Sequence, residues 1–184
     1  MRFSEYGFDR SAFGFGGGGG GGVVKSIQHG LLSMAGLLAT ISITAVDTTK
    51  AIIIFSSYNS DVTSMTADKY VVRASITTST TINFVAQTAA SLNTQIAWTV
   101  VEFNNVKSLQ KGSFTQQGGI DITKSISQVD INKSLLFYSF TTKSTSTNIL
   151  QILSRAYIED DTTLSFSFIT SFDVTCNWQL IEFN

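Results

Sequence analysis

The chain has 184 residues, 43% of them hydrophobic and 14% charged, with a formal net charge of −1. This composition argues against a disordered chain, and the balanced charge, without a basic block, argues against a nucleic-acid partner held by electrostatic attraction. One cysteine and one histidine exclude an intramolecular disulfide, a His-based catalytic triad and a multi-histidine metal site within one chain. We therefore expect a folded protein without a metal ion or a cofactor.

Residues 1–15 mix aromatic and charged side chains, and they lack the apolar segment of a signal peptide. They are interpreted either as a disordered start of the chain or as a docking arm whose aromatic side chains anchor in pockets of another protein. The side chains that would dock are Phe3, Tyr6, Phe8, Phe13 and Phe15. Residues 16–22 are consecutive glycines, which predicts a flexible linker with a reach of roughly 14 Å.

Residues 23–104, here called module 1, have a hydrophobic period of two, which predicts β-strands. Residues 51–55 are all apolar, as expected of a strand that is buried on both faces. Residues 77–81 predict a hairpin turn, and residues 57–68 predict a longer loop. The apolar stretch 30–45 is too short to span a membrane, so we expect no membrane insertion.

Residues 105–184, here called module 2, repeat the pattern of module 1. Four blocks recur in the same order after 80 to 83 residues, which indicates a tandem duplication. The recurring blocks are 24–30 with 106–112, 46–50 with 129–133, 73–74 with 155–156, and 97–104 with 177–184. Modules of roughly 80 residues are marginally stable alone, so we expect them to pack together or to oligomerise.

Five to six short strands in each module predict an all-β protein made of two tandem antiparallel β-sandwich modules, with little room for helices. In both closing strands the polar face becomes apolar near its end, through Val101 and Phe103 and through Ile181 and Phe183. A strand that is apolar on both faces needs a second partner, which is either the other module or another subunit. We take these four residues as candidate oligomer contacts.

No catalytic set emerges from the sequence, so we do not expect an enzyme. His29 corresponds to Lys111 in the repeat, which predicts an exposed strand position. Cys176 lies on the apolar face of its strand and is expected to be a buried thiol rather than a nucleophile. Trp98 and Trp178 fall on inward faces, where they are expected to anchor the cores rather than to bind sugars.

Two charged pairs occupy equivalent positions in the modules: Arg73 with Arg155, and Glu102 with Glu182. One interpretation is a structural ion pair, or a hydrogen-bonded charge, inside each module. The other is an arginine that binds a ligand. Both interpretations stay open on the sequence.

The ordered pattern Val-Lys-Ser-Ile-Gln-x-Gly, Val-Asp-x-x-Lys with an apolar run, Arg-Ala, and Trp-x-Val-Val-Glu-Phe resembles small β-modules of tailed-bacteriophage virion proteins. Over residues 23–184 it is also similar to the H-type lectin fold. That resemblance implies a six-stranded antiparallel sandwich in each module and trimeric assembly. In H-type lectins an arginine, with histidine and aspartate, binds N-acetylgalactosamine-like sugars at subunit boundaries, which implies Arg73 and Arg155 as ligand residues. The family's histidine has no counterpart in residues 84–87 or 166–169.

The resemblance leads us to expect a virion structural protein, either a capsid decoration or a tail appendage. It would be made in the host cytoplasm and displayed on the particle surface as a homotrimer, held by its arm to other virion proteins. Adhesion to the host, with a surface glycan as a possible ligand, would suit such a display. The alternative is a lectin-like receptor-binding protein whose main task is to recognise host surface glycans.

Overall fold

The computed structural model describes residues 23–59, 66–117, 119, 121–146, 153–170 and 172–184. The predicted docking arm and glycine linker, residues 1–22, lie outside this part, as do residues 60–65 of the predicted loop 57–68. The described chain is all-β with antiparallel pairing, as predicted. Its helical segments are one four-residue helix, α1 (Ala67–Tyr70), and one 3-10 turn (Ile131–Lys133).

Module 1 is built on two long strands that run through both layers of a sandwich. Its strands are β1 (Val24–Ser42), β2 (Ala51–Asn59), β3 (Val72–Thr78) and β4 (Thr81–Phe103). One half of β4 pairs with β2 and the other half with β3, while β1 pairs along both halves. The register of β1 shifts on both sides of Gly36, whose φ of 111° favours glycine. The bend there turns β1 from one layer into the other.

Module 2 has the same pairing with the long strands divided in two. Its strands are β5 (Ser108–Gln117), β6 (Ile122–Ser125), β7 (Ser134–Thr142), β8 (Ser154–Asp160), β9 (Thr163–Phe168) and β10 (Asp173–Glu182). They form the sheets β5-β10-β7 and β6-β9-β8. Strands β5 and β6 take the places of the two halves of β1, and β10 and β9 take those of β4. The strand pairings therefore correspond one to one between the modules.

Each module has its own apolar core, formed by the inward faces of its strands. Trp98 and Trp178 lie in equivalent places in the two cores, as predicted, and so do Phe84 and Phe166. The predicted hairpin turn of module 1 is confirmed between β3 and β4. The apolar run 51–55 departs from the prediction at Ile54, which is 40% exposed, because only part of the outer face of β2 is covered.

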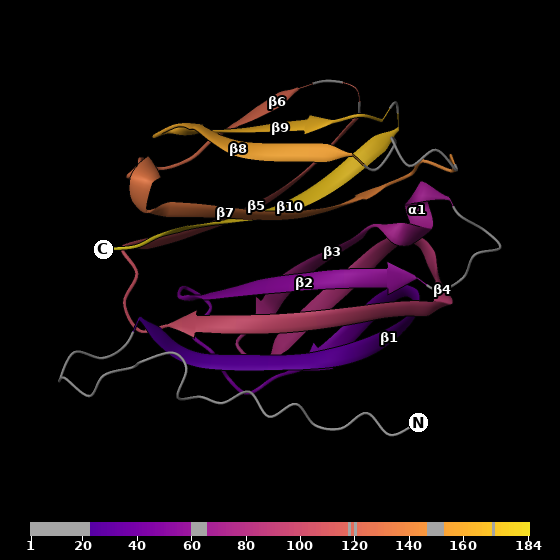
Figure 1. Cartoon of the computed structure of the whole chain (residues 1–184), viewed down its shortest axis with the longest axis horizontal. Coiled ribbons are helices and arrows are strands. Elements are labelled where there is room, and N and C mark those ends of the chain that lie inside the picture. Colours follow the sequence, from indigo (N-terminus) through magenta and orange to yellow (C-terminus); the bar gives the residue numbers. More distant parts are fainter. Residues whose placement is uncertain (1–22, 60–65, 118, 120, 147–152, 171) are drawn as a thin grey trace.

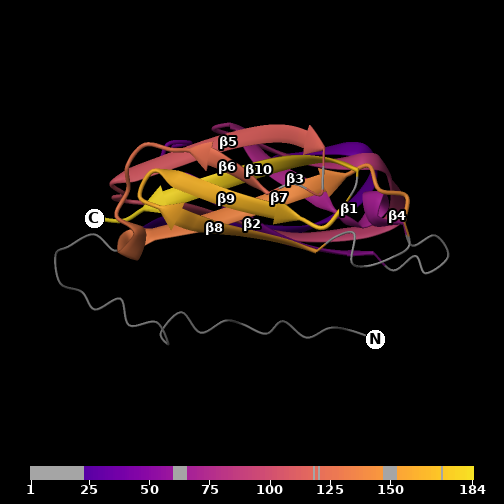
Figure 2. The ribbon, with the colours of Figure 1, turned by 90° about the horizontal axis from the view of Figure 1, so that it is seen from above.

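The two modules pack as an edge against a face (Figure 1). The outer edges of β2 and β3 in module 1 lie against the outer face of the β5-β10-β7 sheet, and the views from the side and from above agree on this (Figures 1 and 2). At one end of the junction Ile52, Phe103 and Ile181 form a third buried cluster, with Val101 and Phe183 packed against it. The apolar ends of both closing strands thus meet between the modules of one chain.

Candidate functional site

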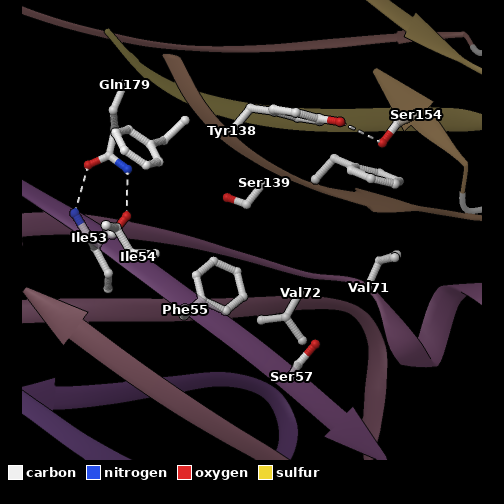
Figure 3. A pocket seen from close by; sticks show the side chains of 12 residues that line it. Ile53, Ile54, Phe55, Ser57, Val71, Val72, Tyr138, Ser139, Ser154 and Gln179 are labelled. Atoms are coloured by element: carbon white, nitrogen blue, oxygen red, sulfur yellow. Dashed lines mark hydrogen bonds between the residues drawn. The ribbon is translucent and has the colours of Figure 1, made fainter. Parts of the chain in front are cut away.

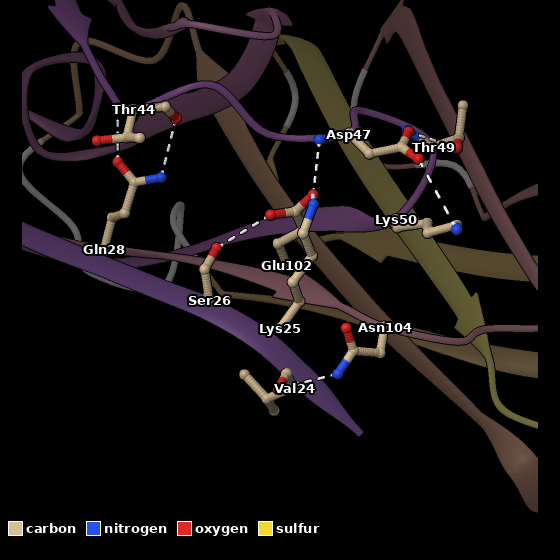
Figure 4. Close-up of polar contacts among 10 residues, drawn as sticks. All are labelled: Val24, Lys25, Ser26, Gln28, Thr44, Asp47, Thr49, Lys50, Glu102 and Asn104. Carbon is tan, nitrogen blue, oxygen red and sulfur yellow. Dashed lines mark hydrogen bonds and ion pairs between the residues drawn. The ribbon is translucent and has the colours of Figure 1, made fainter. Parts of the chain in front are cut away.

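The buried carboxylate of Glu102 joins three parts of module 1 (Figure 4). Its Oε1 accepts from Lys25 Nζ at 2.8 Å and from the backbone N–H of Asp47 at 2.9 Å, and its Oε2 accepts from Ser26 Oγ at 3.0 Å. Burial alone would raise the pKa of Glu102, but the bonds from Lys25, Asp47 and Ser26 outweigh burial and lower it. We call this arrangement the carboxylate clip; it ties the first strand and a loop to the closing strand.

Module 2 contains the same carboxylate clip, centred on Glu182. The carboxylate accepts from Lys107 Nζ at 2.8 Å, from the N–H of Asp130 at 2.7 Å and from Ser108 Oγ at 3.2 Å. The bond from Lys107 is the main reason that the pKa of Glu182 is lowered. The Lys-Ser and Val-Asp repeats of the sequence are therefore explained as parts of a structural clip.

The glycine that ends the first repeated block makes room for the core tryptophan. A Cβ added at Gly30 would lie 2.7 Å from the indole of Trp98, and one at Gly112 would lie 2.5 Å from the indole of Trp178. On the opposite, outer face of the sheet a hollow lies over each glycine–tryptophan pair, whose indole is packed in the core. These two hollows lie at equivalent places in the two modules.

The hollow over Trp178 lies in a cleft of about 340 Å³ between the modules, lined on the other side by β3. Arg73 extends across it from β3, half-buried, with a guanidinium nitrogen 3.4 Å from Asn177 Oδ1. Arg73 Nε is buried and has no hydrogen-bond partner among the described residues. Burial lowers the pKa of this arginine.

Lys111 brings a second positive charge to the same cleft. Its ammonium donates to the backbone oxygen of Thr48 at 2.8 Å, and partial desolvation lowers the pKa of Lys111 to about 8 although the residue as a whole is exposed. Within the described chain no carboxylate forms an ion pair with Arg73 or Lys111. We call the set Arg73, Lys111, Asn177 and Trp178 the cationic cleft. Its two cationic side chains suit an anionic ligand.

The predicted arginine pair is not brought together by the fold. Arg155 is exposed on β8, where its Nε donates to Ser167 Oγ at 3.1 Å and its guanidinium lies 5.7 Å from the ring centroid of Tyr157. It lines a different cavity from Arg73. Neither arginine pairs with Glu102 or Glu182, because the lysines of the carboxylate clips hold those carboxylates.

The junction also contains a cavity of about 420 Å³ beside the cationic cleft (Figure 3). Its walls include Phe55 and Val72 of module 1 and Tyr138 of module 2. At one side the amide of Gln179 accepts from the Ile53 N–H and donates to the Ile53 carbonyl, both at 2.9 Å. These bonds satisfy the outward backbone groups of Ile53 on β2, so we assign Gln179 to module packing.

The remaining predicted positions lie as follows. His29 is exposed on β1, as predicted. Cys176 is buried in the core of module 2, where burial raises its pKa to about 12, so the thiol is not a nucleophile near neutral pH. Residues 1–15, with the docking aromatics, lie outside the described chain. Among the described residues no group of three or more His, Cys, Asp or Glu side chains is placed to hold a metal ion.

Three further residues of the junction, Lys111, Asn177 and Gln179, were not identified from the sequence. A signal was present, because their counterparts in module 1 are His29, Ala97 and Thr99. Positions where a repeat changes chemistry are candidates for a surface that only one copy uses.

The described helix is far too short to cross a membrane.

Comparison of the chain with protein-family models, curated proteins and solved structures finds no match. The site therefore has to be interpreted from its own geometry.

Proposed function

We propose that this chain is a non-enzymatic structural protein of a bacteriophage particle, a capsid decoration or a tail appendage displayed on the particle surface. In this proposal residues 1–15 dock into other virion proteins and residues 16–22 form the tether. The two modules derive from a tandem duplication, and three copies assemble. Displayed repeats suit host adhesion, because linked weak contacts gain strength through avidity.

The observation that supports a structural role is how the residues shared by both modules are used. Glu102 and Glu182 are buried and held by a lysine, a serine and a backbone N–H, and each glycine of the repeated block makes room for a tryptophan. These side chains stabilise the β-framework and do not converge on a cavity. Variation between the modules is found on their outer faces, which is where an assembly protein makes its contacts.

The proposed attachment is tested by comparing the full chain with residues 23–184 for co-sedimentation with the particle that the protein is proposed to join. Deletion of residues 1–22 is expected to abolish co-sedimentation while the circular dichroism and thermal unfolding of the fragment stay unchanged. Replacing the five aromatic residues of the arm by serine in the full chain is the matched variant. Attachment of the truncated chain at the level of the full chain would refute the docking arm.

A lectin-like role is the second candidate, and the cationic cleft is the observation that favours it. Arg73 and Lys111 present positive charge in the cleft between the modules, and no carboxylate of the described chain forms an ion pair with either of them. A carboxylate-bearing sugar offers an anion for these two cations.

Glycan binding is tested on an array of acidic and neutral glycans with the variants Arg73→Ala and Lys111→Ala. Each is expected to lose binding to acidic glycans by at least about tenfold, which corresponds to one charge-assisted hydrogen bond. Arg155→Ala is the matched control, because Arg155 lies outside the cleft. Equal binding by all three variants and the original chain would remove the cleft as a glycan site.

A further inference from the structure

The contact between the modules joins two different surfaces. Module 1 contributes the outer edges of β2 and β3, and module 2 contributes the outer face of β5-β10-β7. The side chains of Gln179 and Asn177 bond the backbone of Ile53 and Ala74, respectively, across this junction. Each module has both an edge and a face of this kind, but the contact uses the edge of one module and the face of the other. The face of module 1 and the edge of module 2 are therefore left unused.

The unused face belongs to module 1 and exposes several apolar side chains. The outer face of its β1-β4-β2 sheet corresponds in strand order to the covered face of module 2. On it Leu31 is 82% exposed, Ile27 58% and Ile54 40%. The hollow over Trp98, about 430 Å³, is the counterpart of the hollow over Trp178 that β3 covers within the chain. An exposed apolar face of this kind marks an interaction surface.

The unused edge belongs to module 2. Strand β8 holds the place that β3 has in module 1, since Ala156 pairs with Phe166 as Ala74 pairs with Phe84. Arg155 and Tyr157, the counterparts of Arg73 and Ser75, are exposed there. No side chain of the described chain bonds the backbone of Ala156 as Asn177 bonds that of Ala74.

We propose that copies of this chain associate head to tail, with the β7–β8 edge of one copy seated on the outer face of β1-β4-β2 in the next. The contact repeats the internal one, so that Arg155 and Tyr157 lie over the Trp98 hollow as Arg73 and Ser75 lie over the Trp178 hollow. Thr99 and Ala97 stand where Gln179 and Asn177 do in the internal contact, so this contact lacks the amide bonds to the strand edge and depends on apolar packing. Repetition gives a ring if the rotation closes and a filament if it does not.

This inference specifies the self-association contained in the proposed function, and it stands on the internal contact alone. Its test uses purified full chain without particles or glycans, so its failure leaves the attachment and glycan experiments unaffected. The molar mass is measured by light scattering over a range of concentrations. We expect masses above the monomer, either one closed species or a series that grows with concentration. A monomer at every concentration would overturn the proposal.

Two variants separate this contact from other modes of association. Leu31→Asp blocks the free face, and Arg155→Glu combined with Tyr157→Asp blocks the free edge; each is expected to be a folded monomer where the original chain is assembled. Leu37→Asp is the matched control, because Leu37 is 54% exposed on β1 but lies beyond the bend at Gly36. This variant should assemble like the original chain.

The decisive measurement mixes the two blocked variants. A head-to-tail contact leaves one intact face and one intact edge in the mixture, so a one-to-one heterodimer and no larger species is expected by native mass spectrometry. A face-to-face contact would instead let the edge-blocked variant assemble by itself. That result, or normal assembly of Leu31→Asp, would overturn the proposal.

Discussion

At the scale of single residues, the stability of each module depends on a few side chains with little freedom to change. Glu182 is nearly fully buried, yet it stays charged because a lysine, a hydroxyl and a backbone N–H all donate to it. Such a carboxylate is stable only while its donors are present, since an unpaired buried charge is costly. The same holds for Glu102 in module 1.

Glu182→Gln is expected to lower the free energy of unfolding by about 1–3 kcal/mol, because a neutral amide cannot accept from all three donors. The pKa of Glu182 is below its ordinary value of 4.5 in the folded chain, so its contribution is present above pH 4.5 and is lost as the pH falls through the lowered pKa. Urea unfolding at pH 7 and at pH 3 should therefore show the difference between the two proteins shrinking in acid. Glu159→Gln, at an exposed position near the end of β8, is the control and should change nothing.

Gly112→Ala is expected to destabilise module 2 by about 1–3 kcal/mol, because the new methyl group overlaps the Trp178 indole and forces it to move. Thermal unfolding followed by tryptophan fluorescence measures both the loss of stability and the displaced ring. Ser113→Ala, at the exposed neighbouring position, serves as the control. An unchanged melting temperature in Gly112→Ala would contradict the close packing described above.

At the scale of elements, strand edges and strand faces determine how the modules meet. An edge strand presents backbone groups that need partners when they are buried. Strand β2 finds them in the side chain of Gln179, and β3 in Ser139 and Asn177, so polar side chains on a sheet face substitute for a further strand. This explains why module 2 carries Asn177 and Gln179 where the equivalent face of module 1 has Ala97 and Thr99.

Gln179→Ala removes both bonds to the backbone of Ile53, and we expect the Ile53 amide to exchange with solvent at least about tenfold faster, in line with one lost hydrogen bond. Hydrogen exchange read by NMR measures this amide directly. Thr99→Ala is the equivalent change on module 1. The Thr99 side chain bonds no strand edge in the described chain, so this variant should leave amide exchange across β2 unaltered. Equal protection of Ile53 in both variants would mean that Gln179 does not hold the edge.

At the scale of the whole molecule, an apolar cluster makes one body of two modules. Ile181 is fully buried in it, Ile52 is 2% exposed, and the rings of Phe103 and Phe183 meet edge to face with their centroids 5.4 Å apart. These contacts come from the ends of the closing strands, so the last residues of each module also join it to the other. The predicted oligomer contacts thus find apolar partners already within one chain.

Ile181→Ala is expected to cost about 2–5 kcal/mol, the range for a large-to-small change in a packed core. Because the cluster couples the modules, we also expect one cooperative urea transition to split into two. Fluorescence from the two tryptophans, one in each core, monitors both modules. Ile54→Ala, at a 40% exposed position, is the control and should retain a single transition with little loss; a single transition in Ile181→Ala would show that other contacts couple the modules.

The sequence by itself determined the strand content, the equivalence of the two halves and the inward positions of Trp98 and Trp178. These properties follow from local periodicity and from repeated blocks, which need no knowledge of what lies across a junction. It also indicated that the apolar ends at Phe103 and Phe183 need a partner, without deciding between a module and a subunit.

Only the tertiary structure decided which residues meet. Lys25 and Lys107, rather than the arginines, hold the buried glutamates. Lys25 lies on β1 and Lys107 directly precedes β5, and each of these strands pairs with the closing strand that carries the glutamate, more than 70 residues away in the chain. The cationic cleft joins Arg73 of one module to Lys111 and Asn177 of the other. Such a site depends on the angle at which two modules pack, which no pattern within either module contains. The sequence therefore specifies the modules, and their packing specifies the site.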